Sequence, residues 1–344
     1  MDTGSCVSVG PTGCASRGRG AFAARAVRAG ELLVRRERPL RGTLGEALGS
    51  DCTGRFCPQC GEVAASPVAR ESVELLCRAG CGARYCSEAC RGAAWASGHR
   101  LLCVGRLPTA RSPLVRFRLL AAEAGGEGVL LRAGAAVCAA YEAALAGDWA
   151  HAAALLRLQR APWEEVAIVM TAQSDDGAAT RRRRAACYAA ARQLRLAIRN
   201  SARHFALLER DGADVPLAGE ALQQLASDRA FSLLAGSLAL NDVAVVLGRS
   251  RRDVDLDGAA IFSRTVCLNH ACDGYANCRV DFPSSRALAD VVALRDIASG
   301  EELLHTYAPD TRFLSFDCAC PACVSSDEEE EDRGDTRQRK RTRL

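Results

Sequence analysis

The sequence contains almost no lysine, and we expect no apolar run in it to be long enough to cross a membrane. Lys340 is the only lysine among 344 residues, so arginine carries nearly all of the positive charge. Genome base composition can produce a chain rich in arginine and alanine, and we draw no function from it. The first residues, MDTGSCVSVG, lack the basic and then apolar layout of a signal peptide. These absences predict a soluble intracellular protein, which we expect in the nucleus and cytoplasm.

The composition limits the classes of function. Hydrophobic residues make up 49% of the chain, which is enough for a sizeable core. The formal net charge of +4 is too mild to indicate a nucleic-acid binder by itself. The 18 cysteines, in an intracellular protein, indicate metal sites rather than disulfide bonds.

Shifts in composition divide the chain into six segments. They are 15–56 with expected strands, 57–103 with a dense cysteine cluster, 104–230 with helical spacing, 231–310 with strands, 311–323 with a second cysteine cluster, and 324–344, an acidic and then basic tail. The tail is too polar to fold alone, so we expect it to be disordered. Turn signals at Arg28–Gly30 and Ala298–Gly300 are each expected to join two strands, the second pair in a hairpin-like connection.

The first cysteine cluster consists of four closely spaced ligand pairs. The pairs are Cys57 with Cys60, Cys77 with Cys81, Cys86 with Cys90, and His99 with Cys103. Eight sulfur and nitrogen ligands are the number that two tetrahedral zinc sites need. Four consecutive pairs with this spacing argue against a set of unliganded core cysteines. Spacing alone leaves open which pairs share a metal.

The second cluster, FDCACPAC, supplies three thiols, from Cys318, Cys320 and Cys323. A closed zinc site needs four ligands. Cys272, in the stretch CLNHACDGYANC, is the best candidate for the fourth.

Several motifs together resemble a SET domain interrupted by a MYND zinc finger, as in the SET-and-MYND lysine methyltransferases. The motifs are RGRG at 17–20, the cysteine pairs at 57–103, NHAC at 269–272, GEELLHTY at 300–307 and FDCACPAC at 316–323. The resemblance implies an α+β fold, in which short sheets are interrupted by the finger and a helical insert and followed by a post-SET zinc loop. It also implies three zinc ions per chain. One is held by Cys57, Cys60, Cys86 and Cys90, another by Cys77, Cys81, His99 and Cys103, and the third by Cys272 and the three post-SET cysteines.

The same resemblance implies methyl transfer from S-adenosylmethionine to a protein lysine. Tyr307 is then the catalytic residue, with its hydroxyl near the transferring methyl group. The implied cofactor-binding residues are Arg17, Gly18, Arg19, Gly20, Asn241, Asn269, His270, Tyr307 and Phe316. The implied partners are a protein substrate, such as a histone tail, and proline-containing peptides at the finger.

The chain departs from the family pattern after the NHAC motif. Ala271 replaces a serine, the usual proline is absent, and two additional residues precede Asn277. Only the eight residues 308–315 separate Tyr307 from Phe316, fewer than is usual. An alternative function is therefore an inactive, zinc-rich scaffold for protein interactions. A nucleic-acid binder that uses Arg181–Arg184 is a weaker alternative, because no base-reading motif accompanies these arginines.

Overall fold

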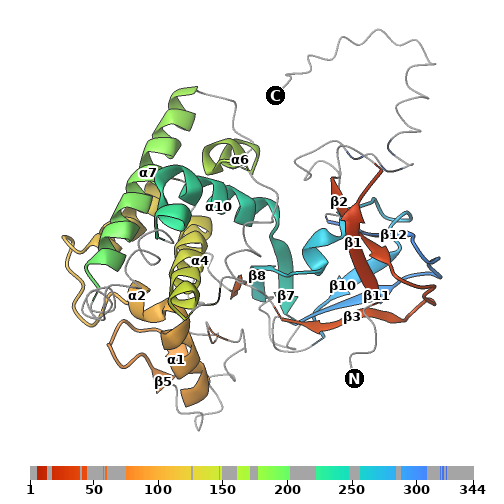
Figure 1. Ribbon diagram of the computed structural model, residues 1–344, viewed down its shortest axis with the longest axis horizontal. Helices are drawn as coiled ribbons and strands as arrows, with labels where there is room; N and C mark the ends of the chain where they lie inside the picture. Colours follow the sequence, from red (N-terminus) through yellow and green to blue (C-terminus); the bar gives the residue numbers. More distant parts are fainter. Residues whose placement is uncertain are drawn as a thin grey trace. The chain divides into compact units, whose positions relative to one another are not determined.

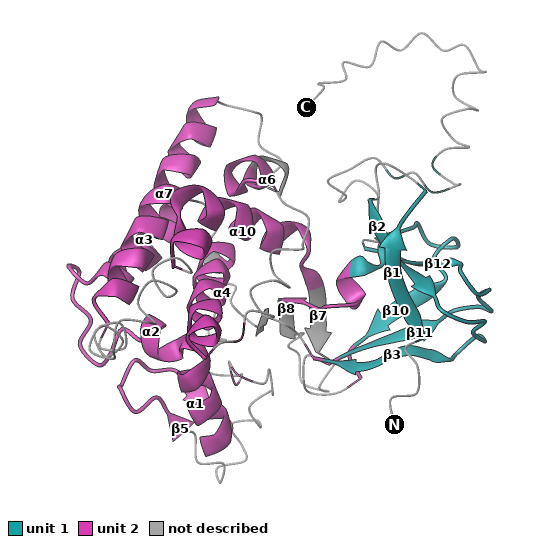
Figure 2. Cartoon of the chain, viewed as in Figure 1, with its two compact units in different colours: residues 1–37, 267–281, 289–344 teal, residues 38–266, 282–288 magenta. Residues whose placement is uncertain are grey.

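The computed structural model describes residues 6–13, 18–38, 41–44, 57, 59, 75–124, 127–146, 148, 161–170, 177–201, 222–247, 256–283, 288–307, 318, 320 and 323 (Figure 1). The chain forms two compact units (Figure 2). Unit 1 consists of Met1–Glu37, Cys267–Asp281 and Ala289–Leu344, and unit 2 of Arg38–Val266 and Phe282–Leu288. The combination of helices with short sheets confirms the predicted α+β class. The six predicted segment boundaries stay a prediction.

Unit 1 contains two small sheets. The first has the order β1 (Val7–Pro11), β2 (Arg19–Ala23), β12 (Glu302–His305) and β9 (Asn269–His270). The second has the order β10 (Cys278–Asp281), β11 (Ala289–Ala293) and β3 (Leu32–Glu37). Alternating residues of β11 are buried, which is the pattern of a strand with one face on a core. Each sheet contains one pair of strands from opposite ends of the chain, β2 with β12 in the first and β3 with β11 in the second.

Two corners of unit 1 share a sequence pattern and pair with each other. ARAVRAGE (Ala24–Glu31) and LRDIASGE (Leu294–Glu301) each place a glutamate six residues after an arginine, and in both the two side chains form an ion pair. Val27 and Ile297 exchange two backbone hydrogen bonds, both of 2.9 Å. The corners are thus related by an approximate local two-fold axis.

The corners fix how β2 and β12 meet. Gly300 N donates to Ala23 O at 2.8 Å, and Ala23 N donates to Glu301 O at 2.9 Å. These bonds continue the antiparallel pairing of β2 with β12. The expectation of a hairpin-like connection at 298–300 is wrong, since β12 pairs with β2 and β9 whereas β11 pairs with β10 and β3. The turn redirects the chain from one sheet to the other.

Unit 2 is mainly helical. Its helices are α1 (Glu88–Ala94), η1 (Trp95–His99), α2 (Arg100–Leu102), α3 (Pro113–Glu123), α4 (Glu127–Leu145), α6 (Trp163–Met170), α7 (Gly177–Arg199) and α10 (Asp228–Leu240). Its strands are β4 (Arg41–Leu44), β8 (Leu256–Ile261) and β7 (Val243–Leu247) in one sheet, and β5 (Leu75–Leu76) with β6 (Arg84–Tyr85) in another. A short 3-10 turn, η2 (Thr265–Cys267), precedes β9.

Helical spacing explains the core of unit 2. The buried residues of α7 recur every three or four positions, which places them on one face: Cys187, Ala190, Ala191, Leu194 and Ile198. They pack with Phe117, Tyr141 and Phe231 of the neighbouring helices. Many of these core residues are alanines, whose small side chains let the helices approach closely.

One helix corrects the expectation about membrane-length runs. Gly128–Leu145, within α4, has a mean hydropathy of 1.4 over 18 residues and is long and apolar enough to cross a membrane by length and composition alone. Within the structure 61% of this window is buried. The core helix of a soluble protein has the same properties, so the finding is weak support for a membrane span.

The paired corners predict matched effects of two substitutions. Gly30 and Gly300 have φ angles of +79° and +81°, and a Cβ at either would meet no atom within 4 Å. Gly30→Ala and Gly300→Ala should therefore each lower the free energy of unfolding by about 1 kcal/mol, through backbone strain alone. Denaturant unfolding measures this.

The control is Gly92→Ala in α1, where a Cβ also meets nothing within 4 Å but the backbone is helical. It should raise stability slightly, by up to about 1 kcal/mol. A loss at only one of the two corner glycines would contradict their equivalence.

Candidate active site and metal sites

Parallel pairing of β9 with β12 builds the candidate active site in unit 1. Leu304 lies opposite Asn269, and His305 lies opposite His270. Just beyond the pair, Ala271 N donates to His305 O at 3.2 Å. The NHAC and GEELLHTY motifs, separated by about thirty residues, therefore lie side by side.

The Asn269 amide is held in one orientation. Its Nδ2 donates to Arg19 O at 3.0 Å and to Glu302 Oε1 at 2.8 Å. Both partners are acceptors, so the nitrogen must face them. Oδ1 then receives no hydrogen bond from the described residues and is available to a ligand that carries N–H groups.

Gly20 makes this arrangement possible. A Cβ at this position would lie 2.7 Å from Glu302 Oε1, 2.8 Å from Thr12 Cγ2 and 3.0 Å from Asn269 Nδ2. Thr12 N donates to Gly18 O at 2.8 Å, which continues the pairing of β1 with β2. The φ of Gly18 is +63°, and a Cβ there would meet nothing within 4 Å. Gly20 thus lies beside Asn269, and there is open space next to Gly18.

Tyr307 lies just after β12 and is fixed at both ends. Its hydroxyl donates to Leu268 O at 2.6 Å, and its backbone N–H donates to Nδ1 of the buried His270 at 3.0 Å. The Tyr307 residue is 46% exposed. Because the residue is exposed, a ligand can reach its side chain, while the hydrogen bond to Leu268 O keeps the hydroxyl in one position.

Asn277 has a role that the sequence left open. It is 1% exposed, and its side chain pairs with the backbone of β12: Leu304 N donates to Oδ1 at 2.8 Å, and Nδ2 donates to Glu302 O at 2.8 Å. The amide therefore acts like one more strand residue beside β12. Despite the altered spacing before it, the loop still delivers Asn277 to this strand.

His305 is a neutral histidine at neutral pH. Burial lowers its pKa to about 4, and the nearby His270 ring acts in the same direction. A histidine with so low a pKa is a weak proton acceptor.

Four cysteines of unit 1 form the first candidate metal site. The sulfur atoms of Cys272, Cys318, Cys320 and Cys323 all lie within 4.8 Å of one another. Burial raises the pKa of the Cys272 thiol, and the neighbouring cysteines raise it further. Burial acts likewise on Cys320, but backbone N–H groups of Cys272 and Cys323 outweigh it and lower the pKa to about 6. Four thiolates this close repel one another unless a cation holds them, so the donor set suits a soft metal ion.

Unit 2 contains the other two groups. Cys77, Cys81, His99 and Cys103 lie together, with His99 Nε2 at 3.3 Å from Cys77 Sγ and 3.4 Å from Cys81 Sγ. Cys57, Cys86 and Cys90 form the other group. This is the interleaved grouping that the family resemblance implies. Each group could hold a metal ion; Cys60, the expected fourth ligand of the second group, lies outside the described residues.

The finger residues are held on α4. Gly98 has a φ of +116°, and a Cβ there would lie 3.0 Å from Ala139 N and 3.1 Å from Cys138 Cβ. Nearby, Arg100 Nε donates to Glu142 Oε1 at 2.6 Å, although Glu142 is only 6% exposed. This buried ion pair and the close backbone contact attach the cysteine-rich segment to the helical part of unit 2.

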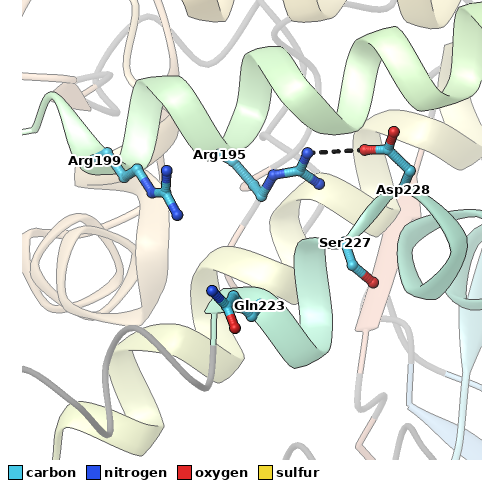
Figure 3. Close-up of a pocket in the computed structure, with 5 residues that line it drawn as sticks. All are labelled: Arg195, Arg199, Gln223, Ser227 and Asp228. Carbon is cyan, nitrogen blue, oxygen red and sulfur yellow. Dashed lines mark hydrogen bonds and ion pairs between the residues drawn. The ribbon is translucent and has the colours of Figure 1, made fainter.

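A cavity of about 350 Å³ in unit 2 includes none of the predicted site residues. Its lining comes from α7, the N-terminal end of α10 and the helical turn before it: Arg195, Arg199, Gln223, Ser227 and Asp228. Arg195 Nη2 donates to Asp228 Oδ1 at 2.8 Å (Figure 3). Ser227 also caps α10 through its contact with Ala230 N, so Arg195, Ser227 and Asp228 already serve the helix packing.

Three predicted site residues lie outside the described residues: Arg17, Cys60 and Phe316. Asn241 lies in unit 2 as the C-terminal cap of α10, where its Nδ2 donates to Ser237 O at 2.7 Å. Its predicted contact with a cofactor stays a prediction. Glu302, by contrast, orients Asn269 but was not among the site residues predicted from the sequence.

The comparison with known families agrees with this geometry. The profile of the SET domain matches residues 18–308. The chain belongs to the SET-domain family. It is also similar to "Protein-lysine N-trimethyltransferase SMYD5" of Gallus gallus, with 30% identity over 105 residues, covering 24% of this chain and 24% of that protein. The match thus spans about a quarter of the relative's length.

The residues that the SET profile matches include β9, β12, Gly18 and Gly20. The GEELLHTY motif also supplies Glu302, whose carboxylate accepts from Asn269 Nδ2. In the sequence, only the position of Glu302 two residues after Gly300 could have pointed to it. Nothing near Glu302 in the sequence shows that its side chain contacts Asn269.

The lowered pKa of the partly buried His305 predicts a pH-dependent stability. Its folded-state pKa of about 4 lies below the usual 6.5, so between these values the unfolded chain binds more protons. Stability should therefore fall as the pH drops from 6.5 to 4, by up to about 3 kcal/mol.

His305→Phe should remove this component. The unfolding free energies of wild type and variant should be measured from pH 7 to pH 4. Their difference isolates the contribution of His305, because acid releases metal from both proteins. A difference that stays constant across this range would contradict the lowered pKa of His305.

Proposed function

We propose that the protein is an S-adenosylmethionine-dependent protein-lysine N-methyltransferase. The observation that supports the proposal is the parallel β9–β12 pair: it holds Asn269, whose Oδ1 accepts no hydrogen bond from the described residues, beside the strand that leads to Tyr307, whose hydroxyl donates to Leu268 O. The SET-domain family and the name of the chicken relative support the same activity. The expected substrate is a lysine side chain of another protein, with the histone tail as one candidate class.

The residues present fit the amino-acid end of the cofactor. S-adenosylmethionine carries an ammonium group, for which Asn269 Oδ1 is an oriented acceptor. At Gly18 a Cβ would meet nothing within 4 Å, so a ligand can approach the backbone there closely, whereas Gly20 makes room for Glu302 and Asn269. The peptide groups beside His270 remain the natural contacts for the adenine, since both ring nitrogens of His270 contact protein groups.

When bound, the cofactor supplies a methyl group on a positively charged sulfur. The Tyr307 O–H proton points to Leu268 O, so the oxygen lone pairs face elsewhere and can stabilise positive charge on a methyl group. The target lysine must lose its proton first, because an amine with a pKa near 10.4 is almost fully charged at neutral pH. A desolvated aromatic environment lowers that pKa. His305, with its pKa near 4, is not the base that removes the proton.

We also propose that the three cysteine groups hold zinc. Thiolate and imidazole donors in groups of four match the ligands of structural zinc sites. No ligand position is left for water or substrate once four protein donors bind, so the metals stabilise the fold and do no chemistry. The finger then serves as a docking module for proline-containing peptides, as the resemblance implies.

Metal analysis tests this set of ligands. The full chain should contain three zinc ions, and Cys272→Ser should lower the content to two. Cys278→Ser is the matched control, because this buried thiol donates to Leu304 O at 3.3 Å and belongs to none of the groups. A content near one in the wild type, or three in Cys272→Ser, would show that the ligands are wrong.

Cofactor binding separates the enzyme from the inactive scaffold. Calorimetry should show one S-adenosylmethionine per chain, and Gly20→Ala should weaken binding at least tenfold, about 1.4 kcal/mol, because the new Cβ displaces Asn269 and Glu302. Gly10→Ala is the control, since Gly10 lies opposite Gly20 in β1 and its Cβ would meet Phe22 only at 3.8 Å. A wild type that binds no cofactor would favour the scaffold.

Transfer activity tests the assignment of Tyr307. Tyr307→Phe should retain cofactor affinity but lower kcat by about 100-fold or more, since the ring still packs and only the hydroxyl is lost. Tyr275→Phe, in the exposed loop before Asn277, should be close to wild type. Lys340 is the only lysine, so any self-labelling can be mapped to one side chain. Equal turnover by Tyr307→Phe and wild type would remove Tyr307 from the catalytic role.

A further inference from the structure

His270 contacts two parts of unit 1 that the proposed chemistry treats as separate. Its Nδ1 accepts a hydrogen bond from Tyr307 N at 3.0 Å, and its Nε2 lies 3.7 Å from Cys272 Sγ. The residue is 4% exposed, so the ring sits inside the unit. One side of the imidazole thus faces the candidate catalytic tyrosine and the other faces the four-cysteine group.

The contact with Tyr307 determines which nitrogen carries the proton. A backbone N–H can only donate, so Nδ1 must accept and the hydrogen of the neutral ring is on Nε2. That N–H group faces Cys272 Sγ. A thiolate bound to a metal remains an acceptor for such a donor, and groups of this kind orient metal ligands and adjust metal affinity.

The backbone at Tyr307 needs this contact. The pairing of β12 with β9 ends at His305, two residues earlier. Thr306 is held by its own hydroxyl, which donates its one hydrogen to Asp273 Oδ1 at 2.9 Å and also lies 3.2 Å from Ala271 O. The backbone N–H of Tyr307 instead donates to the His270 imidazole. The His270 and Tyr307 rings also pack, with centroids 5.4 Å apart.

We propose that His270 is a positioning residue that couples metal occupancy of the four-cysteine group to the placement of Tyr307. The effect on catalysis rests on the proposed function. The coupling between the four-cysteine group and Tyr307 does not require methyl transfer. With metal bound, Cys272 is held in place and fixes the imidazole, which in turn fixes the Tyr307 backbone. Without metal the four thiols separate, the ring loses its second contact, and Tyr307 becomes more mobile.

Two substitutions separate the contacts. Asparagine places a polar atom near the Nδ1 position, so His270→Asn can keep the Tyr307 hydrogen bond and lose the one to Cys272. Glutamine reaches the Nε2 position, so His270→Gln can keep the donor to Cys272 and lose the bond to Tyr307. We expect His270→Asn to weaken binding at the four-cysteine group by about 10- to 100-fold, and His270→Gln to bind metal close to wild type. Cobalt(II) titration, followed by the thiolate-to-metal absorption, measures the affinity.

The coupling itself is tested by amide hydrogen exchange at Tyr307, which requires no activity. In the wild type, removal of the metals by a chelator should increase the exchange rate at Tyr307 at least tenfold. In His270→Gln the rate should be high with or without metal. Cys81→Ser is the control, because it disrupts only a finger group in unit 2 and should leave Tyr307 exchange as in the wild type.

If a His270 variant fails to fold, hydrogen exchange at Tyr307 in the wild type, with and without metal, still tests the proposal. Unchanged exchange at Tyr307 after metal removal would overturn the proposal, and so would wild-type cobalt affinity in His270→Asn. A protein that shows the coupling but transfers no methyl group would instead contradict the proposed function and leave this inference standing.

Discussion

The parallel pairing of β9 with β12 is the interaction on which the candidate site depends. Parallel strands need a long connection, and here the connecting chain runs from His270 to Glu302 through β10, β11 and the second corner. The pair is only two residues long. It persists because side chains extend it: Asn277 pairs with the backbone of β12, and His270 bonds to Tyr307. Polar side chains thus replace the strand hydrogen bonds that so short a sheet lacks.

The two corners supply the second constraint. Because Ala24–Glu31 and Leu294–Glu301 pair about a local two-fold axis, β2 and β12 meet in a fixed register. That register places Gly20 against Glu302 and Asn269. Residues from the start and the end of unit 1 therefore form one site, and the intervening unit 2 can fold around its own helical core.

Much of the chemistry was predictable from the sequence, because ligand spacing and short motifs are local properties. The grouping of Cys272 with Cys318, Cys320 and Cys323 followed from the need for a fourth thiol. The partners of β12 were not predictable, since a turn at Ala298–Gly300 predicts a hairpin unless the second sheet is known. The roles of Glu302 and Asn277 depend on these long-range partners and were missed for the same reason. The repeat of ARAVRAGE in LRDIASGE was visible and could have indicated the paired corners.

Hydrogen exchange of the full chain, with and without S-adenosylmethionine, tests the central claim most directly. If β9 and β12 together form the cofactor site, the ligand should slow exchange in 18–22, in 268–277 and in 301–307 at the same cofactor concentration. Exchange in α7 and α10, which line the cavity of unit 2, should not change. Protection limited to α7 and α10, or no protection anywhere, would contradict the account.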